Sequence, residues 1–139
     1  MADPRAELRL VDTSVWIRAD RKRRSPLQER LKGFIISGAA FICWPVRAEL
    51  LIGARDEARL ETLDDQLSAL PHLAVTEETW RQGSRIGRSL ARTGKTVPLV
   101  DLLIASIAMG SGMTLWTVDL DFERIEGVSD LDVDWFGVA

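Results

Sequence analysis

Apolar residues recur along the chain in two different patterns, and their alternation indicates an α/β fold. Short runs with almost no polar residue are typical of strands buried in a parallel sheet. Longer segments that repeat an apolar residue every three or four positions are typical of helices. Strands are predicted at 8–11, 39–44, 73–75, 114–118 and 131–136, and helices at 14–19, 26–37, 45–53, 56–70, 76–93, 98–109 and 121–125.

Turn and cap residues support these boundaries. Ser25 followed by Pro26 is a typical helix start, and Gly38 and Gly94 are typical helix ends. Between the first two helices, residues 18–24 are predicted to form an exposed basic turn. The order of the elements predicts an α/β sandwich around a mostly parallel sheet. No repeat, linker or low-complexity segment interrupts residues 1–139, so we expect a single domain.

Composition narrows the class of protein. The 139 residues are 46% hydrophobic and 28% charged, with a net charge of −3. No apolar run reaches the roughly 18 residues of a membrane span, and the first residues lack the apolar segment of a secretory signal. The single cysteine, Cys43, favours a reducing cytoplasm. One histidine and one cysteine are too few for a His/Cys zinc site, so any metal would be held by oxygen, as Mg²⁺ and Mn²⁺ are.

Four acidic residues stand where an ordinary structural role explains them poorly. Asp12 directly follows the first strand run, and Asp119 follows the fourth. Glu49 lies beside apolar residues on a helix, and Asp101 lies in an almost wholly apolar one. A buried carboxylate is costly unless it is paired or bound to a metal. Taken singly, each acid has a simpler interpretation: a cap or first-turn residue for Asp12 and Asp101, and a solvated helix face for Glu49.

Taken together, the four positions indicate one pocket. In a parallel sheet, the carboxyl ends of the strands and the starts of the following helices lie at the same edge. Four carboxylates there would raise one another's pKa values unless a divalent cation neutralised them. The matching chemistry is metal-assisted hydrolysis of a phosphodiester. A phosphatase with Asp12 as nucleophile is a weaker alternative, because such enzymes usually carry a second aspartate where this chain has Ser14.

Four segments resemble the PIN-domain ribonucleases, and within them the VapC-type toxins of bacterial toxin–antitoxin pairs. The segments are L-V-D-T-S-V-W-I at 10–17, R-A-E-L-L-I-G at 47–53, L-A-R-T-G-K-T-V-P-L-V-D-L-L-I-A at 90–105 and T-V-D-L-D-F at 117–122. The resemblance implies a five-stranded parallel sheet flanked by helices. It implies that the metal-binding acids are Asp12, Glu49, Asp101 and Asp119. As a hypothesis of mechanism, the three aspartates hold the metal and Glu49 positions or deprotonates the attacking water. Asp121 is expected to support the site or to cap the next helix.

The resemblance predicts a Mg²⁺- or Mn²⁺-dependent endoribonuclease whose cognate VapB-type antitoxin covers the acidic pocket, plausibly with a basic residue. A homodimer packed through apolar helix faces is also implied. Leu60, Leu63 and Leu67 are candidates for that contact, although core packing explains them equally well. A non-catalytic module of the same fold, whose acids receive a partner's basic residues, is the alternative, and it would show no Mn²⁺-dependent RNA cleavage.

A row of arginines suggests how an acidic protein could hold RNA. Arg81, Arg85, Arg88 and Arg92 fall on one face of the helix predicted at 76–93. Trp80 and the small or apolar residues of that helix fall on a different face, which we expect to be buried. With the basic segment 18–24, this stripe could bind a phosphate backbone; a solvated face is the simpler alternative. The tryptophans at 16, 44, 80, 116 and 135 are expected to pack mostly in the core rather than stack on bases.

Hydroxyl groups flank the predicted pocket. Thr13, Ser14 and Thr117 adjoin the strand-end acids in sequence. Hydrogen bonds from such side chains commonly orient metal-binding carboxylates. We therefore expect these three residues to support the acids.

Overall fold

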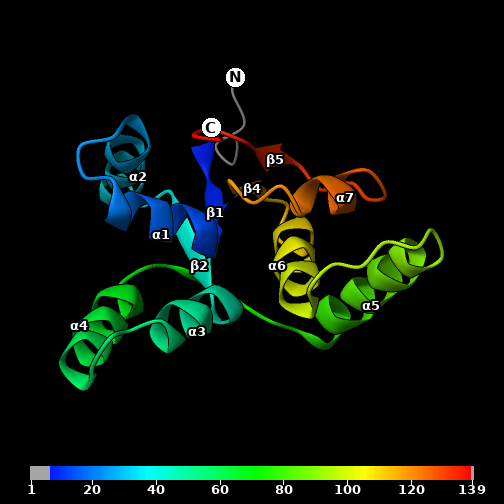
Figure 1. Ribbon diagram of the computed structural model, residues 1–139, viewed down its shortest axis with the longest axis horizontal. Helices are drawn as coiled ribbons and strands as arrows, with labels where there is room; N and C mark the ends of the chain where they lie inside the picture. The colour runs from blue at the N-terminus through cyan, green and yellow to red at the C-terminus, as the bar shows by residue number, and fades with distance from the viewer. Residues whose placement is uncertain (1–6, 139) are drawn as a thin grey trace.

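The structure is a computed structural model, and it describes residues 7–138 (Figure 1). Its strands are β1 (Arg9–Val11), β2 (Ala40–Cys43), β3 (His72–Leu73), β4 (Thr114–Trp116) and β5 (Val133–Asp134). Its helices are α1 (Thr13–Arg21), α2 (Pro26–Ile36), α3 (Trp44–Ile52), α4 (Glu57–Ser68), α5 (Glu77–Ala91), α6 (Leu99–Gly110) and α7 (Phe122–Glu126). Within residues 7–138, no helix combines the length and apolar character needed to cross a membrane.

The strands form one sheet in the order β3-β2-β1-β4-β5, and every neighbouring pair is parallel. This confirms the predicted α/β class and parallel sheet. The chain runs outward from β1 to β3 and then returns to the other side of β1 for β4 and β5. The direction of the strand order therefore switches between β1 and β4. Open α/β sheets bind ligands in the crevice outside the strand ends at such a point.

Helices cover both faces of the sheet because successive strand residues point to opposite sides. Leu10 and Leu115 belong to a core shared with residues of α3, α4, α5, α6 and α7. Their neighbours Val11 and Trp116 belong to a second core, shared with α1 and α2. Figure 1 shows α1 and α2 on one side of the central strands and α5 and α6 on the other. The central strands are thus buried from both faces, as their apolar runs predict.

Some elements end elsewhere than predicted. Helix α1 continues to Arg21, so the first half of the basic segment 18–24 is helical rather than a turn. Strand β4 stops at Trp116, and the amide of Val118 donates to the Ser14 hydroxyl at 3.1 Å instead of joining the sheet. Strand β5 is short because the amide of Phe136 turns back to the carboxylate of Asp134.

The tryptophans and leucines divide between core and surface. Trp16, Trp116 and Trp135 lie in or against the core. The core prediction is wrong for Trp44 and Trp80, whose exposed fractions are 54% and 49%. Trp44 lies instead against the guanidinium of Arg47, 4.2 Å away. On α4, Leu67 is buried and Leu63 packs against the core, so these two of the three candidate dimer leucines stabilise the fold.

The C-terminal segment 134–137 is tied to α2 and β1 by one carboxylate. Asp134 accepts hydrogen bonds from Arg9 at 2.9 Å and Arg30 at 2.5 Å. The guanidinium of Arg30 also lies 4.5–5.0 Å from the ring centres of Phe34, Trp116 and Phe136. Burial alone would raise the pKa of Asp134, but these hydrogen bonds lower it below its ordinary value.

A lowered pKa means that the Asp134 carboxylate contributes stability above about pH 4, which is lost as the pH falls further. Asp134→Asn should therefore lower the free energy of unfolding at pH 7 by about 1–3 kcal/mol and by much less at pH 3. Urea denaturation measures both values. The control is Asp130→Asn, an exposed residue, which should change stability by less than about 0.5 kcal/mol. Equal losses at both pH values for Asp134→Asn would contradict this account.

Candidate metal centre

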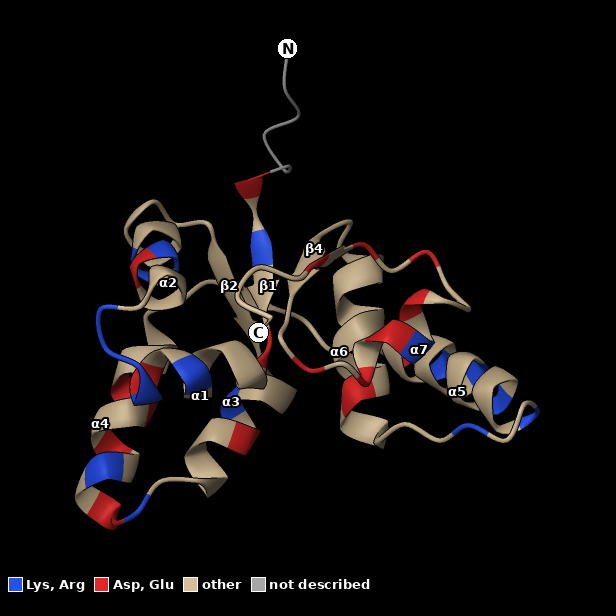
Figure 2. Cartoon of the chain, turned by 45° about the horizontal axis from the view of Figure 1, so that its top comes forward, with Lys and Arg blue, Asp and Glu red and all other residues tan. Residues whose placement is uncertain are grey.

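Five acidic side chains come from elements far apart in sequence. Asp12 follows β1 and is the N-cap of α1, whereas Asp119 and Asp121 lie in the loop between β4 and α7. Glu49 lies on α3, and Asp101 lies in the first turn of α6. In Figure 2, acidic positions gather where α6 approaches α7. The site therefore lies at the switch point of the sheet, as the strand-end positions of the acids predict.

Asp12 is buried, with 3% of its surface exposed, and two hydroxyls hold its carboxylate. Its Oδ2 accepts hydrogen bonds from Ser14 Oγ at 2.6 Å and Thr117 Oγ1 at 2.8 Å. The backbone amide of Ser14 adds a third hydrogen bond to the same oxygen. Burial raises the pKa of Asp12, and these hydrogen bonds offset part of that rise. Because they converge on Oδ2, they leave Oδ1 as the oxygen able to bind a cation.

Asp101 carries the clearest electrostatic signature of the site. Its exposed fraction is 8%, and its pKa is raised to about 7, first by burial and then by the charges of Asp12, Asp119, Glu49 and Asp121. A first-turn position on a helix would by itself favour the charged form. Burial and neighbouring carboxylates outweigh that effect here. A capping role alone therefore does not explain Asp101, and its pKa reports the convergence of all five acids.

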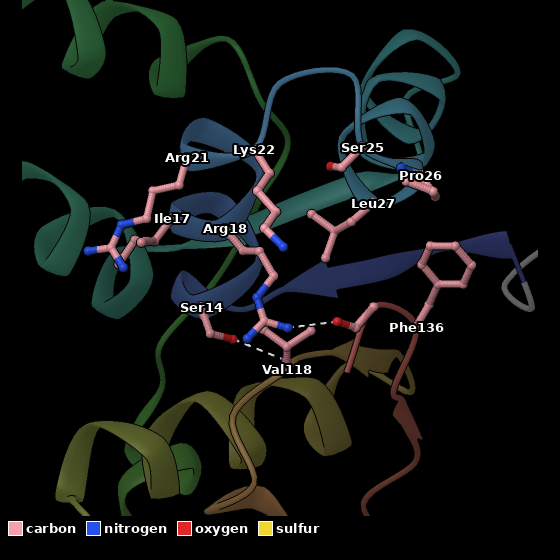
Figure 3. A pocket seen from close by; sticks show the side chains of 11 residues that line it. Ser14, Ile17, Arg18, Arg21, Lys22, Ser25, Pro26, Leu27, Val118 and Phe136 are labelled. Carbon is pink, nitrogen blue, oxygen red and sulfur yellow. Dashed lines mark hydrogen bonds between the residues drawn. The ribbon is translucent and has the colours of Figure 1, made fainter. Parts of the chain in front are cut away.

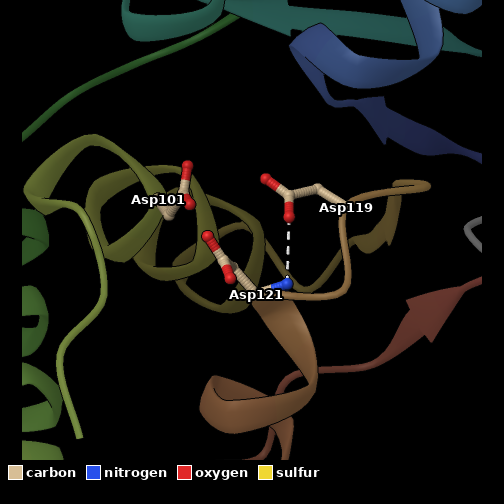
Figure 4. A group of neighbouring side chains, drawn as sticks. All are labelled: Asp101, Asp119 and Asp121. Atoms are coloured by element: carbon tan, nitrogen blue, oxygen red, sulfur yellow. Dashed lines mark hydrogen bonds between the residues drawn. The ribbon is translucent and has the colours of Figure 1, made fainter.

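Three of these carboxylates lie close enough to share one ion. Asp101, Asp119 and Asp121 each offer an oxygen, and these oxygens lie within 4.8 Å of one another. Figure 4 shows the three side chains pointing into a common space from α6 and from the loop between β4 and α7. Thr117 connects Asp12 to this group, because its hydroxyl donates to Asp12 Oδ2 and accepts from the backbone amide of Asp119. The charges of Asp12 and Glu49 contribute to the raised pKa of Asp101.

Of the two roles expected for Asp121, capping of the next helix is not observed. Although it is the N-cap of α7, its side chain makes no capping hydrogen bond. Its backbone amide instead donates to Asp119 Oδ1 at 2.9 Å. Asp119 thus stabilises the turn, and the carboxylate of Asp121 is free to face Asp101. The D-L-D spacing after a strand indicates in the sequence that two acids lie near the site. Only the turn geometry shows that Asp119 is the one that accepts a backbone amide.

Glu49 is oriented by the neighbouring helix. Its Oε1 accepts a hydrogen bond of 2.7 Å from the hydroxyl of Thr13, in the first turn of α1. The hydroxyls of Thr13, Ser14 and Thr117 therefore bond directly to the acids, as predicted. The donor set is rich in carboxylate oxygen and contains neither histidine nor cysteine, which suits a hard divalent cation such as Mg²⁺ or Mn²⁺ rather than zinc.

The predicted arginine stripe is exposed along α5, but two of its members are already paired. Arg81 contacts Glu77 at 2.6 Å, and Arg85 contacts Glu78 at 3.2 Å. Arg88 and the C-cap residue Arg92 are exposed, and among the described residues neither forms an ion pair. The opposite face is buried at Gly83, Ile86 and Leu90, whereas Trp80 and Ala91 are exposed, contrary to prediction.

Comparison with known proteins assigns the chain to a family. A family model described as the PIN domain matches residues 9–128, from β1 through α7. Ribonuclease VapC11 from Mycobacterium tuberculosis (strain ATCC 25618 / H37Rv) is 32% identical over 131 residues, covering 91% of this chain and 98% of VapC11. Ribonuclease VapC18 from the same strain is 29% identical over 129 residues, covering 90% and 92%.

Solved structures agree with these sequence matches. The DNA-bound VapBC structure from Salmonella typhimurium gives a TM-score of 0.75 at 26% identity, covering 91% of this chain and 97% of that chain. The fold and the acidic centre thus define a PIN domain, a class of metal-dependent nucleases. The chain belongs to this family, in its branch of VapC ribonucleases. That membership favours the enzyme over the non-catalytic module and over the phosphatase.

The raised pKa of Asp101 predicts a stability effect in the metal-free protein. The protonated Asp101 carboxyl group contributes fully to folding stability below about pH 4, and this contribution is lost as the pH rises to about 7. In EDTA at pH 8, Asp101→Asn should therefore increase the free energy of unfolding by about 1–3 kcal/mol, and at pH 4 it should change little. Asp65→Asn, at an exposed position on α4, should be neutral at both pH values. A destabilised Asp101→Asn protein at pH 8 would be the opposite of the expected result.

Proposed function

We propose that this chain hydrolyses RNA phosphodiester bonds at the acidic centre, as the toxin of a type II toxin–antitoxin pair. The observation that carries the proposal is the convergence of Asp101, Asp119 and Asp121 within 4.8 Å. Buried Asp12 borders the group, and the chain belongs to the VapC ribonucleases. Such a concentration of poorly solvated carboxylates is costly unless a cation neutralises it.

Asp12, Asp101 and Asp119 would hold Mg²⁺ or Mn²⁺, and the position of the Asp121 carboxylate supports adding it to the set. When bound, the ion would supply a nucleophile at neutral pH and stabilise the leaving oxyanion. Ser14 and Thr117 orient Asp12 through Oδ2. Thr13 holds Oε1 of Glu49, so the other carboxylate oxygen can accept a proton from the attacking water.

A VapB-type antitoxin is the proposed protein partner, because solved structures with this fold are VapBC complexes. A basic side chain of the antitoxin inserted among the acids would neutralise the same charge as the cation and so compete with it. Formation of a homodimer stays a prediction.

Replacing one acid should separate catalysis from folding. Asp12→Asn and Asp101→Asn should each reduce Mn²⁺-dependent cleavage of total RNA by about 100-fold or more, because each removes a charged ligand. Mapping the new 5′ ends measures the cleavage, and circular dichroism checks the fold. Asp65→Asn is the matched control and should cleave like the wild type. Full metal-dependent cleavage by Asp101→Asn would rule out the assigned site.

A second pair of variants tests the role of Asp121. Because its side chain makes no capping hydrogen bond and its charge repels Asp101, Asp121→Asn should leave thermal stability in EDTA unchanged or slightly raised. It should nevertheless weaken Mn²⁺ binding by about tenfold or more, measured as the Mn²⁺ concentration that raises Tm. Glu123→Gln, an exposed change in the first turn of α7, is the control. Unchanged Mn²⁺ binding in Asp121→Asn would restore the expected supporting role.

A further inference from the structure

A cavity of about 880 Å³ lies against α1, and its lining includes Ser14 and Val118 (Figure 3). Its walls come from α1, from the start of α2 and from the C-terminal segment 134–137. Three of its lining residues are cationic: Arg18, Arg21 and Lys22. Apolar lining is supplied by residues that include Leu27 and the 42%-exposed Phe136. The cavity therefore combines positive charge with an aromatic surface.

Helix α1 connects this cavity to the acids. Ser14, Arg18, Arg21 and Lys22 are spaced i, i+4, i+7 and i+8, so they share one face of the helix. The Ser14 hydroxyl donates to Asp12, the N-cap of α1. It accepts a hydrogen bond from the backbone amide of Val118, the residue before Asp119. The cationic row begins one turn beyond that hydroxyl and extends about 6 Å along the helix, so that its far end lies about 12 Å from Ser14. A ligand in the cavity would thus continue directly from the acidic centre.

The charge of this row is available to a ligand. The segment 18–24 holds five cationic residues and one acid, in a chain with a net charge of −3. Among the described residues, none of those five cations forms an ion pair. Arg18 donates to the carbonyl of Gly137 at 2.6 Å, which leaves Arg21 and Lys22 exposed at the rim. On α5, by contrast, Arg81 and Arg85 are paired with glutamates of their own helix.

The basic turn is also held in place. Arg24 has a left-handed backbone, with φ at 61°, a conformation that is unfavourable for a non-glycine residue. The side-chain amide of Gln28 secures it, accepting from the amide of Arg24 at 2.7 Å and donating to the carbonyl of Ala19 at 2.9 Å. The backbone that carries these cations is therefore held in a defined position.

We propose that this cavity is the subsite that holds the RNA strand on one side of the scissile phosphate. Arg21 and Lys22 contact backbone phosphates, and Phe136 offers a surface on which a base stacks. Sites for single-stranded RNA commonly combine a cationic groove with an aromatic platform of this kind. The proposal rests on the ribonuclease function proposed above, and it adds the path of the substrate.

Two double variants with the same loss of charge decide between this subsite and the arginine stripe. Arg21→Gln/Lys22→Gln removes the cations at the cavity, and Arg88→Gln/Arg92→Gln, at the end of α5, removes the two exposed, unpaired members of the stripe, which is the competing RNA surface. Binding of labelled single-stranded RNA is measured in EDTA as a function of salt. The cavity pair should weaken binding about tenfold near 0.1 M salt and lower the salt slope by about 1.4. The α5 pair should change both values much less. Equal losses in the two pairs, or none in the cavity pair, would overturn the proposal.

Cleavage assays with Mn²⁺ distinguish failure of the subsite from failure of the function. The cavity pair should raise KM with little change in kcat, and Arg21→Lys/Lys22→Arg should restore KM. Wild-type protein that cleaves, with an unchanged KM for the cavity pair, would refute the subsite alone. Wild-type protein that does not cleave RNA would refute the function. If the cavity pair binds RNA normally but no longer binds a co-expressed antitoxin, the cavity is a protein interface and the proposal is wrong.

The base contact needs a test that leaves the fold intact, because Phe136 also packs against Trp116. RNA containing 4-thiouridine next to the cleavage site should crosslink, in EDTA, to the peptide that contains Phe136. Crosslinks confined to other peptides would place the strand elsewhere.

Discussion

Repulsion among carboxylates in a poorly solvated crevice is the constraint on which this structure depends. Asp12 and Asp101 are nearly inaccessible to water, and burial raises the pKa of both. Hydrogen bonds from Ser14 and Thr117 offset part of this cost at Asp12. At Asp101 the neighbouring negative charges increase the cost of holding a charged carboxylate. The rest of the fold must therefore hold the acids together against a force that separates them.

The packing of α6 shows how the fold does so. Residues 101–108 are buried without interruption, and Ile104, Ala105 and Ala108 have no measurable exposure. The helix that carries Asp101 thus lies inside the main core, where burial of apolar side chains stabilises it by roughly 1.5–3 kcal/mol for each large residue. Sequence-distant acids can converge because each lies at the end of a strand or helix that this core fixes. A cation that binds only the folded state would add its binding free energy to that stability.

Most of the elements could be predicted, and four acids could be selected as a candidate site, because the signals are local: apolar periodicity, caps and acids at strand ends. What could not be predicted depends on contacts between distant segments. Helix α1 extends to Arg21 where Gln28 of the next helix binds the carbonyl of Ala19. Asp121 faces the site because Asp119 accepts its backbone amide. The exposure of Trp44 and Trp80 depends on tertiary packing that apolar runs do not reveal.

Helix α1 explains how an acidic chain can accommodate both a cation and a polyanion. Its N-terminus, capped by Asp12, carries the positive end of the helix dipole, which favours the negative charge of the acidic centre. Its last turn contains Arg18 and Arg21, whose charges are favoured by the negative end of the same dipole. One short helix thus stabilises two opposite charges about two turns apart. The net charge of −3 does not reveal this separation of charge. Within the length of α1, an RNA strand would contact the arginines at the C-terminal end of the helix and reach the proposed metal site at its N-terminal end.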